Sequence, residues 1–426
     1  MKRPNELTLA QASVALSAAQ ISSEALVQSC LDRIDERNDD VQAWCALDAE
    51  KAIADARQRD ASERKSPLHG IPVGIKDIID TKGLPTSYGN RRYQQHIPSA
   101  DAQIIHQLHQ LGAVVLGKTV TTEFAYYAPG PTRNPNNLEH TPGGSSSGSA
   151  AAVADFQVPF ALGTQTAGSM IRPGSFNGIV ALKPSFSTLP YAGVHTLAAS
   201  LDTLGLFSRT IGDQRILLTT LAPHMAIQNS PSRIRVAVCR TPWWNQADTE
   251  MQEAFNDYCQ SLANTGVECT DYELSTIFAE LAEAQTQLMA LETSRSLADE
   301  YRNHSKSLDQ RTIAFIDQGL TVSVEQEADY RNLTARARLR LQAIFEQFDV
   351  ILTPPAPGAA PKGLESTGDP VFNRVWTMLG VPCLTYPIRR NADNLPLGIQ
   401  LIAPFGRDHQ LIDIADKLQS AVRTGE

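Results

Sequence analysis

The sequence predicts an α/β protein whose sheet is covered by helices on both faces. Short apolar runs typical of buried strands recur between segments with helical periodicity. These runs lie at residues 113–116, 158–163, 179–182, 234–239, 350–353, 382–386 and 397–402. Such alternation predicts a largely parallel sheet, because parallel strands need a crossover, usually a helix, between them. The 426 residues are expected to form a single domain, residues 1–426, although length alone would allow two or three.

The predicted elements divide the chain into four regions. Residues 1–62 are predicted to be helical, and within them residues 23–38 carry apolar side chains at helical spacing. A core region at residues 65–220 begins with an apolar run, residues 71–79, that predicts a buried strand. A second helical region at residues 245–347 separates this core from a C-terminal sheet and helix at residues 348–426. We expect the second helical region to form a cap over the site, where substrate choice usually resides.

The composition argues against several classes of function. The net charge is −9, from 46 acidic and 37 basic residues, without a long basic run, so nucleic-acid binding is not expected. No stretch approaches the roughly 20 apolar residues of a membrane span, and no apolar segment follows the first residues as in a secretory signal. The six cysteines show neither a CxxC pair nor a zinc spacing. We therefore expect a cytoplasmic protein with reduced thiols and with no metal, cofactor or membrane contact; a homodimer is compatible with the sequence.

Three segments carry the candidate chemistry. The first is the strand 71–79, which holds Lys76. The second is a run of glycines and serines, residues 143–149, that leads into the small residues 150–154. The third is Gly163-Thr-Gln-Thr-Ala-Gly-Ser-Met-Ile-Arg-Pro173, which follows a short apolar run. Together these segments, with their spacing, resemble the amidase signature family, serine hydrolases that cleave carboxamides with a Ser-Ser-Lys triad. The resemblance covers about residues 68–184 and resumes at 348–406.

The resemblance implies a fold and a set of site residues. The fold is the amidase signature fold, a large twisted mixed β-sheet wrapped by helices. Ser169 is implied to be the nucleophile, and Ser145, on a cis peptide, to pass a proton between Ser169 and the base Lys76. The residues implied to support the triad or to lie at the substrate are Ser146, Thr164 and Gly144.

The chemistry of Lys76 can also be argued from the residue itself. A free lysine titrates near 10.4, so only about 4 in 10,000 are neutral at pH 7. Lowering that pKa to about 7 needs roughly 4–5 kcal/mol of preference for the neutral amine, which burial in a strand can supply. The alternative is that Lys76 ends its strand and pairs with Asp77. The serine segments at matching spacing favour the interpretation as a base.

The glycine- and serine-rich run has other interpretations as well. Such composition often marks a flexible linker, but this run is short and leads directly into a helix of small residues. A phosphate-binding loop would need Gly-Lys-Ser/Thr at its end, and no lysine follows here. Glycine allows the chain segments to approach one another closely, as a proton relay requires.

Residues Thr166, Ala167, Gly168 and Ser169 are the predicted oxyanion site. Their consecutive backbone N–H groups would bind the oxygen of a tetrahedral intermediate. The G-x-S-x-G motif is absent around Ser169, which argues against an α/β-hydrolase.

Three positions depart from the commonest pattern of the family. Gln165 stands where most members have Asp, and Ala167 stands where they have Gly. Arg172 lies three residues after Ser169, as in the malonamidase-type branch, in which the corresponding arginine helps to bind a substrate carboxylate. A guanidinium can hold a carboxylate with two hydrogen bonds, so Arg172 is a candidate substrate ligand. The alternative is a structural arginine paired with a buried acid.

The sequence thus predicts an amidase that hydrolyses a small carboxamide through an acyl-enzyme, with a carboxylate-bearing amide as one candidate substrate. The first alternative is the catalytic subunit of a tRNA-dependent amidotransferase, which shares these motifs, needs partner subunits and takes ammonia from glutamine. The short chain and Gln165 argue against it. The second alternative is a non-catalytic binding protein, which the intact triad argues against.

Overall fold

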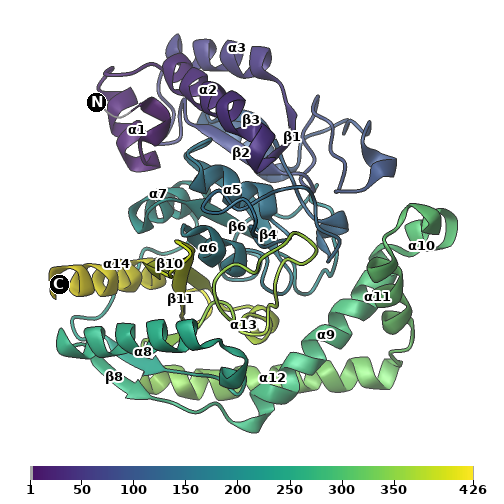
Figure 1. The fold of residues 1–426 in the computed structure, drawn as a ribbon, viewed down its shortest axis with the longest axis vertical. Coiled ribbons are helices and arrows are strands. Elements are labelled where there is room, and N and C mark those ends of the chain that lie inside the picture. The colour runs from purple at the N-terminus through teal and green to yellow at the C-terminus, as the bar shows by residue number, and fades with distance from the viewer. Residues whose placement is uncertain (1–2, 426) are drawn as a thin grey trace.

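A single mixed sheet organises the chain, as the computed structural model, which describes residues 3–425, shows (Figure 1). The sheet has 11 strands within that range, in the order β1-β3-β2-β4-β6-β5-β10-β11-β9-β7-β8. The strands are β1 (Trp44–Leu47), β2 (Pro72–Lys76), β3 (Val114–Thr119), β4 (Phe160–Gln165), β5 (Val180–Lys183), β6 (Thr203–Ser208), β7 (Arg235–Val238), β8 (Glu268–Asp271), β9 (Val350–Thr353), β10 (Cys383–Arg390) and β11 (Pro396–Ile402).

Helices precede, interrupt and follow these strands. The α-helices are α1 (Leu9–Ser17), α2 (Ser23–Val41), α3 (Ala49–Asp60), α4 (Gln103–Leu111), α5 (Ser147–Ala154), α6 (Ile171–Asn177), α7 (Ile211–Leu221), α8 (Thr249–Asn264), α9 (Thr276–Ser296), α10 (Ala298–His304), α11 (Gln310–Leu320), α12 (Val324–Gln347), α13 (Arg374–Leu379) and α14 (Asp408–Gly425). Short 3-10 helices lie at Pro4–Glu6, Arg91–Tyr93, Glu123–Ala125, Trp244–Gln246 and Ser305–Ser307. None of the helices described here is long and apolar enough to cross a membrane.

The sheet is mixed rather than largely parallel. Strand β2 pairs in parallel with β3 and β4, and β7 with β8 and β9, whereas β1, β5, β6, β10 and β11 pair antiparallel with their neighbours. The mixed sheet implied by the resemblance is confirmed, and the parallel sheet expected from alternation is wrong for these strands. Every residue of β2, β3, β4 and β6 is buried, so both faces of the central sheet are covered.

The region predicted to be helical at residues 245–347 divides in two: α8 packs against β8, β10 and β11, whereas α9 to α12 extend away from the sheet. In Figure 1, α9, α11 and α12 form an arm of packed helices at the lower right, with α10 at its tip. The base of α9 packs against α13, and Gln285 of α9 reaches the segment between β4 and α6. The region also contains an unpredicted strand, β8, at the edge of the sheet.

Candidate active site

Lys76 is the last residue of β2, a central strand, and its side chain is completely buried. Its Nζ lies 2.7 Å from Ser145 Oγ and 2.8 Å from Thr164 Oγ1. Burial lowers the pKa of Lys76 well below 10.5, and the carboxylate of Asp202 opposes that shift. The interaction with two neutral hydroxyls offsets little of the cost of burying an ammonium, so the environment favours the neutral amine.

Asp77 does not pair with Lys76, although it is the next residue. Its carboxylate accepts hydrogen bonds from the backbone N–H and the hydroxyl of Ser87, and it lies 3.9 Å from Nζ of Lys118. Lys118 in turn donates to the carbonyl of Ile79 and to two threonine hydroxyls. Asp77 therefore belongs to a separate buried ion pair. The alternative that Lys76 pairs with Asp77 is wrong.

The glycine- and serine-rich segment places Ser145 beside the lysine. The peptide bond between Gly144 and Ser145 is cis, as the resemblance implied. The hydroxyl of Ser147 at the start of α5 donates to the carbonyl of Gly143, and the carbonyl of Ser145 accepts from Thr122 N–H. Ser146 touches neither Lys76 nor Ser145 through its hydroxyl; instead its Oγ pairs with the backbone N–H and carbonyl of residue 164, at 3.2 and 3.1 Å.

The turn between β4 and α6 holds its carbonyls away from the cavity. The carbonyls of Thr166, Ala167 and Gly168 accept hydrogen bonds from Gln285 Nε2 at 3.0 Å, Thr377 Oγ1 at 2.7 Å and Arg172 N–H at 3.0 Å. Within residues 3–425, no group accepts a hydrogen bond from the backbone N–H groups of residues 167–169. This turn therefore offers free N–H donors, as an oxyanion site requires.

Gln165 fixes the end of this turn without a charge. Its Oε1 accepts from the backbone N–H groups of Met170 and Ile171, at 2.8 and 3.1 Å, at the start of α6. Its Nε2 donates to Thr377 Oγ1 at 2.9 Å, which in turn donates to Ala167. The amide thus serves as both acceptor and donor, a combination that an ionised carboxylate cannot provide.

Ser145 and Ser169 line one narrow cavity, together with the turn 166–167 and Arg172. Ser169 is 8% exposed, and the remaining wall is mostly apolar. The other residues lining this cavity are Ala125, Tyr126, Tyr127, Leu197, Met289, Thr367 and Pro370.

Arg172 is buried and lines this cavity, and it forms no ion pair with any described residue. Burial lowers the pKa of its guanidinium to about 10. Its Nε donates to the carbonyl of Thr367 at 2.7 Å, and Nη2 donates to the carbonyl of Gly144 at 2.7 Å. Among the described residues, its Nη1 has no hydrogen-bond partner. The alternative interpretation, an arginine paired with a buried acid, is therefore not found in residues 3–425, and Gly144 contacts Arg172 through its carbonyl.

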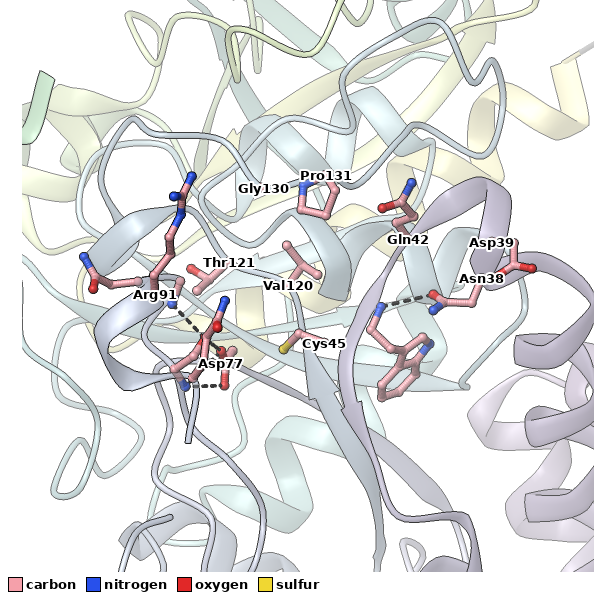
Figure 2. Close-up of a pocket in the computed structure, with 15 residues that line it drawn as sticks. Asn38, Asp39, Gln42, Cys45, Asp77, Arg91, Val120, Thr121, Gly130 and Pro131 are labelled. Atoms are coloured by element: carbon pink, nitrogen blue, oxygen red, sulfur yellow. Dashed lines mark hydrogen bonds between the residues drawn. The ribbon is translucent and has the colours of Figure 1, made fainter. Parts of the chain in front are cut away.

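A larger depression of about 1120 Å³ lies elsewhere on the molecule (Figure 2). Asn38 and Gln42 near the end of α2, Cys45 of β1, and Arg91 contribute to its polar lining. It contains Asp77 but none of the predicted site residues. Among the described residues, no cluster of three or more His, Cys, Asp or Glu could hold a metal ion.

Sequence reasoning missed several residues that build this site. Asp202, just before β6, accepts hydrogen bonds from Thr166 Oγ1 at 2.6 Å and from two backbone N–H groups. Gln285 and Thr377 come from helices distant in sequence. No motif marks these positions, and only the assembled fold brings them to residues 164–169.

Two serines line a small, mostly apolar cavity, and one of them is hydrogen-bonded to a buried lysine, an arrangement typical of a serine hydrolase that uses a lysine as its base. The chain belongs to the amidase family, whose pattern it matches over residues 25–412. It is accordingly an enzyme that acts on amide C–N bonds.

Two kinds of known protein are similar to this chain: amidotransferase subunits and a peptide amidase. A glutamyl-tRNA(Gln) amidotransferase subunit of Cutibacterium acnes is 30% identical over 97% of this chain and 94% of that protein. Its counterpart in Acidothermus cellulolyticus is 31% identical over 98% and 94%, respectively. Among solved structures, native peptide amidase from Stenotrophomonas maltophilia aligns with a TM-score of 0.82 and 26% identity, covering 98% of this chain and 97% of that one.

Proposed function

We propose that this enzyme hydrolyses a small carboxamide that carries a carboxylate, through an acyl-enzyme on Ser169. The observation that carries the proposal is the buried amine of Lys76, bonded only to the hydroxyls of Ser145 and Thr164. A neutral amine has one lone pair, so it can accept the proton of Ser145 while it donates to Thr164.

The reaction then proceeds in two halves. Ser169 Oγ attacks the amide carbon and gives its proton to Ser145, which gives its own to Lys76. The carbonyl electrons move onto oxygen, where the N–H groups of residues 166–169 stabilise the negative charge. Collapse of this intermediate breaks the C–N bond, and the leaving amine takes the proton back through Ser145. Water attacks the ester by the same relay and releases the carboxylate product.

Arg172 supports the choice of an anionic substrate. A buried guanidinium without a carboxylate partner, with Nη1 unpaired, leaves a charge uncompensated within the protein. A substrate carboxylate in the cavity would supply that missing partner. Monoamides of short dicarboxylic acids are small amides that carry such a carboxylate.

Replacing Arg172 should therefore discriminate between substrates. We expect Arg172→Gln to lower kcat/KM for an anionic amide about 10- to 150-fold, because a hydrogen bond to a charged group contributes about 1.5–3 kcal/mol. A neutral amide of matched size should lose far less. Arg209→Gln is the matched control, since Arg209 is also largely buried and donates to the backbone carbonyls of Val158, Asn5 and Leu7, away from the cavity. Equal losses on both substrates would show that Arg172 serves only to hold Gly144 and Thr367.

The second candidate is the catalytic subunit of a tRNA-dependent amidotransferase. The names of the curated relatives favour it over a free-standing hydrolase. The shorter chain counts little against it, because the match spans 94% of those relatives. The same acyl-enzyme chemistry on glutamine would supply ammonia, and partner subunits would bring in the tRNA.

One assay separates the two candidates. The purified chain, without partners, is given a panel of small anionic and neutral amides that includes glutamine, and ammonia release is measured against Ser169→Ala. Release from monoamides of dicarboxylic acids supports the hydrolase. Release confined to glutamine, or dependent on added amidotransferase subunits and tRNA, supports the second candidate instead.

A further inference from the structure

Asp202 is a buried carboxylate directly behind the proposed oxyanion turn. One oxygen, Oδ1, accepts from the hydroxyl of Thr166 at 2.6 Å, and Oδ2 accepts from the backbone N–H groups of Leu197 and Ala198 at 2.8 and 3.0 Å. Thr166 and Leu197 both line the cavity that holds Ser145 and Ser169. A single side chain thus joins two walls of the site.

Asp202 lies next to the strand that pairs with the strand of Thr164. It precedes β6, whose Thr203 and Leu204 are in register with Gln165 and Thr164 of β4. Thr164 is the residue that bonds Lys76 through its hydroxyl. Asp202 is the charged group that acts on Lys76, opposing the effect of its burial.

We propose that Asp202 is a positioning residue that supplies the counter-charge for Lys76 when that amine takes up the nucleophile's proton. This inference rests on the proposed function of Lys76 as the base. Lys76 forms no ion pair within the described residues, so the ammonium formed during attack has no contacting carboxylate. A fixed negative charge behind the turn stabilises that ammonium from a distance, whereas the aspartate of a Ser-His-Asp site stabilises the imidazolium through a direct hydrogen bond.

The other ionisable groups around Asp202 do not supply this charge to Lys76. Glu292 of α9 faces Asp202, but its own carboxylate accepts from Ser200 and from Arg331. Tyr191 also faces Asp202 and stays protonated, since burial raises its pKa. Burial raises the pKa of Asp202 itself to about 6, so it is mostly ionised at pH 7 and above.

The test replaces Asp202 with asparagine. Asn can keep the three hydrogen bonds, since its oxygen can accept from the two backbone N–H groups and its NH₂ can donate to Thr166. The readout is the rate at which a fluorophosphonate probe labels Ser169 as a function of pH, which needs no knowledge of the substrate. With the charge lost, we expect the plateau to fall about tenfold and the apparent pKa of the acid limb to fall by about one unit.

Asp408→Asn is the matched control. Asp408 is also buried, and it accepts from the backbone N–H and hydroxyl of Ser185, at 2.7 and 2.6 Å. It should lower stability but leave the apparent pKa of labelling unchanged. A lower plateau in Asp202→Asn with an unmoved pKa would mean that Asp202 only holds the turn, and would overturn the proposal.

A second variant tests the charge if Asp202→Asn does not fold. Asp202→Glu keeps a carboxylate behind the turn, so the apparent pKa of labelling should stay near that of the wild type, even where the longer side chain lowers the plateau. An apparent pKa that falls by about one unit in Asp202→Glu would overturn the proposal, because the charge would then not set it. Failure of Ser169 to react with the probe at any pH would instead contradict the proposed nucleophile, so the two failures can be told apart.

Discussion

Replacing Ser169 with alanine should abolish acyl-enzyme formation and leave the fold intact. We expect turnover to fall on the order of 10⁶-fold, as when the nucleophile of a serine hydrolase is removed, because no neighbouring group can replace the attacking oxygen. The free energy of unfolding should change by no more than about 0.5 kcal/mol, since the substitution deletes one oxygen at the cavity wall.

Intact-protein mass spectrometry after exposure to a fluorophosphonate probe measures this directly. The wild type should gain one adduct on Ser169, and Ser169→Ala should gain none. Ser147→Ala is the control, because Ser147 belongs to the same serine-rich run but donates its hydroxyl to the carbonyl of Gly143. Labelling that persists on another serine of Ser169→Ala would show that the nucleophile lies elsewhere.

The sequence predicts the central strands better than the edges of the sheet. β4, β5 and β9 each begin with an apolar run and are buried along their whole length, and such runs are easily recognised. The edge strand β8 consists of Glu268–Asp271 and has no buried residue, so no hydrophobic signal marks it. β6 has Gly205 at its centre, where a side chain would meet Met170 and the carbonyl of Leu182. Glycine lowers strand propensity, although close packing requires it here.

The sequence also does not predict which neighbouring strands run parallel and which antiparallel. Strand β10 follows α13 and pairs antiparallel with both β5 and β11, although a helix precedes it. Alternation of helices and strands predicts parallel neighbours only when consecutive strands lie side by side, and β5 and β10 are far apart in the chain. The mixed sheet could be expected only from the family resemblance.

The candidate site likewise contains residues that the sequence indicates and residues that only the folded chain brings together. Lys76, Ser145 and Thr164 lie within hydrogen-bonding reach, and motif spacing pointed to all three. The partners that hold the turn, Gln285 and Thr377, carry no local signal because their roles depend on α9 and α13 packing against it. A polar residue in a helix predicts only an exposed position until its tertiary neighbour is known.

Lys76 should prove essential as a neutral amine. We expect Lys76→Met to lose on the order of 10⁴-fold or more in turnover, because the methionine sulfur cannot act as the base. Lys76→Arg should not restore activity, since a guanidinium stays protonated throughout the accessible pH range. Lys183→Met is the matched control: Lys183 is also completely buried and donates to the carbonyl of Pro184, so its loss should lower stability without removing the base.

The reaction rate of the wild type should increase with pH, because Lys76 acts in its neutral form. Burial lowers the pKa of Lys76 well below 10.5, so the neutral form is reached at a lower pH than for a free lysine. The rate should rise with pH through that apparent pKa and stay level above it, because deprotonation creates the base rather than removing it. The value belongs to the coupled lysine and serines together. A rate that does not vary between about pH 5 and 9, combined with full activity in Lys76→Arg, would mean that a group other than Lys76 serves as the base.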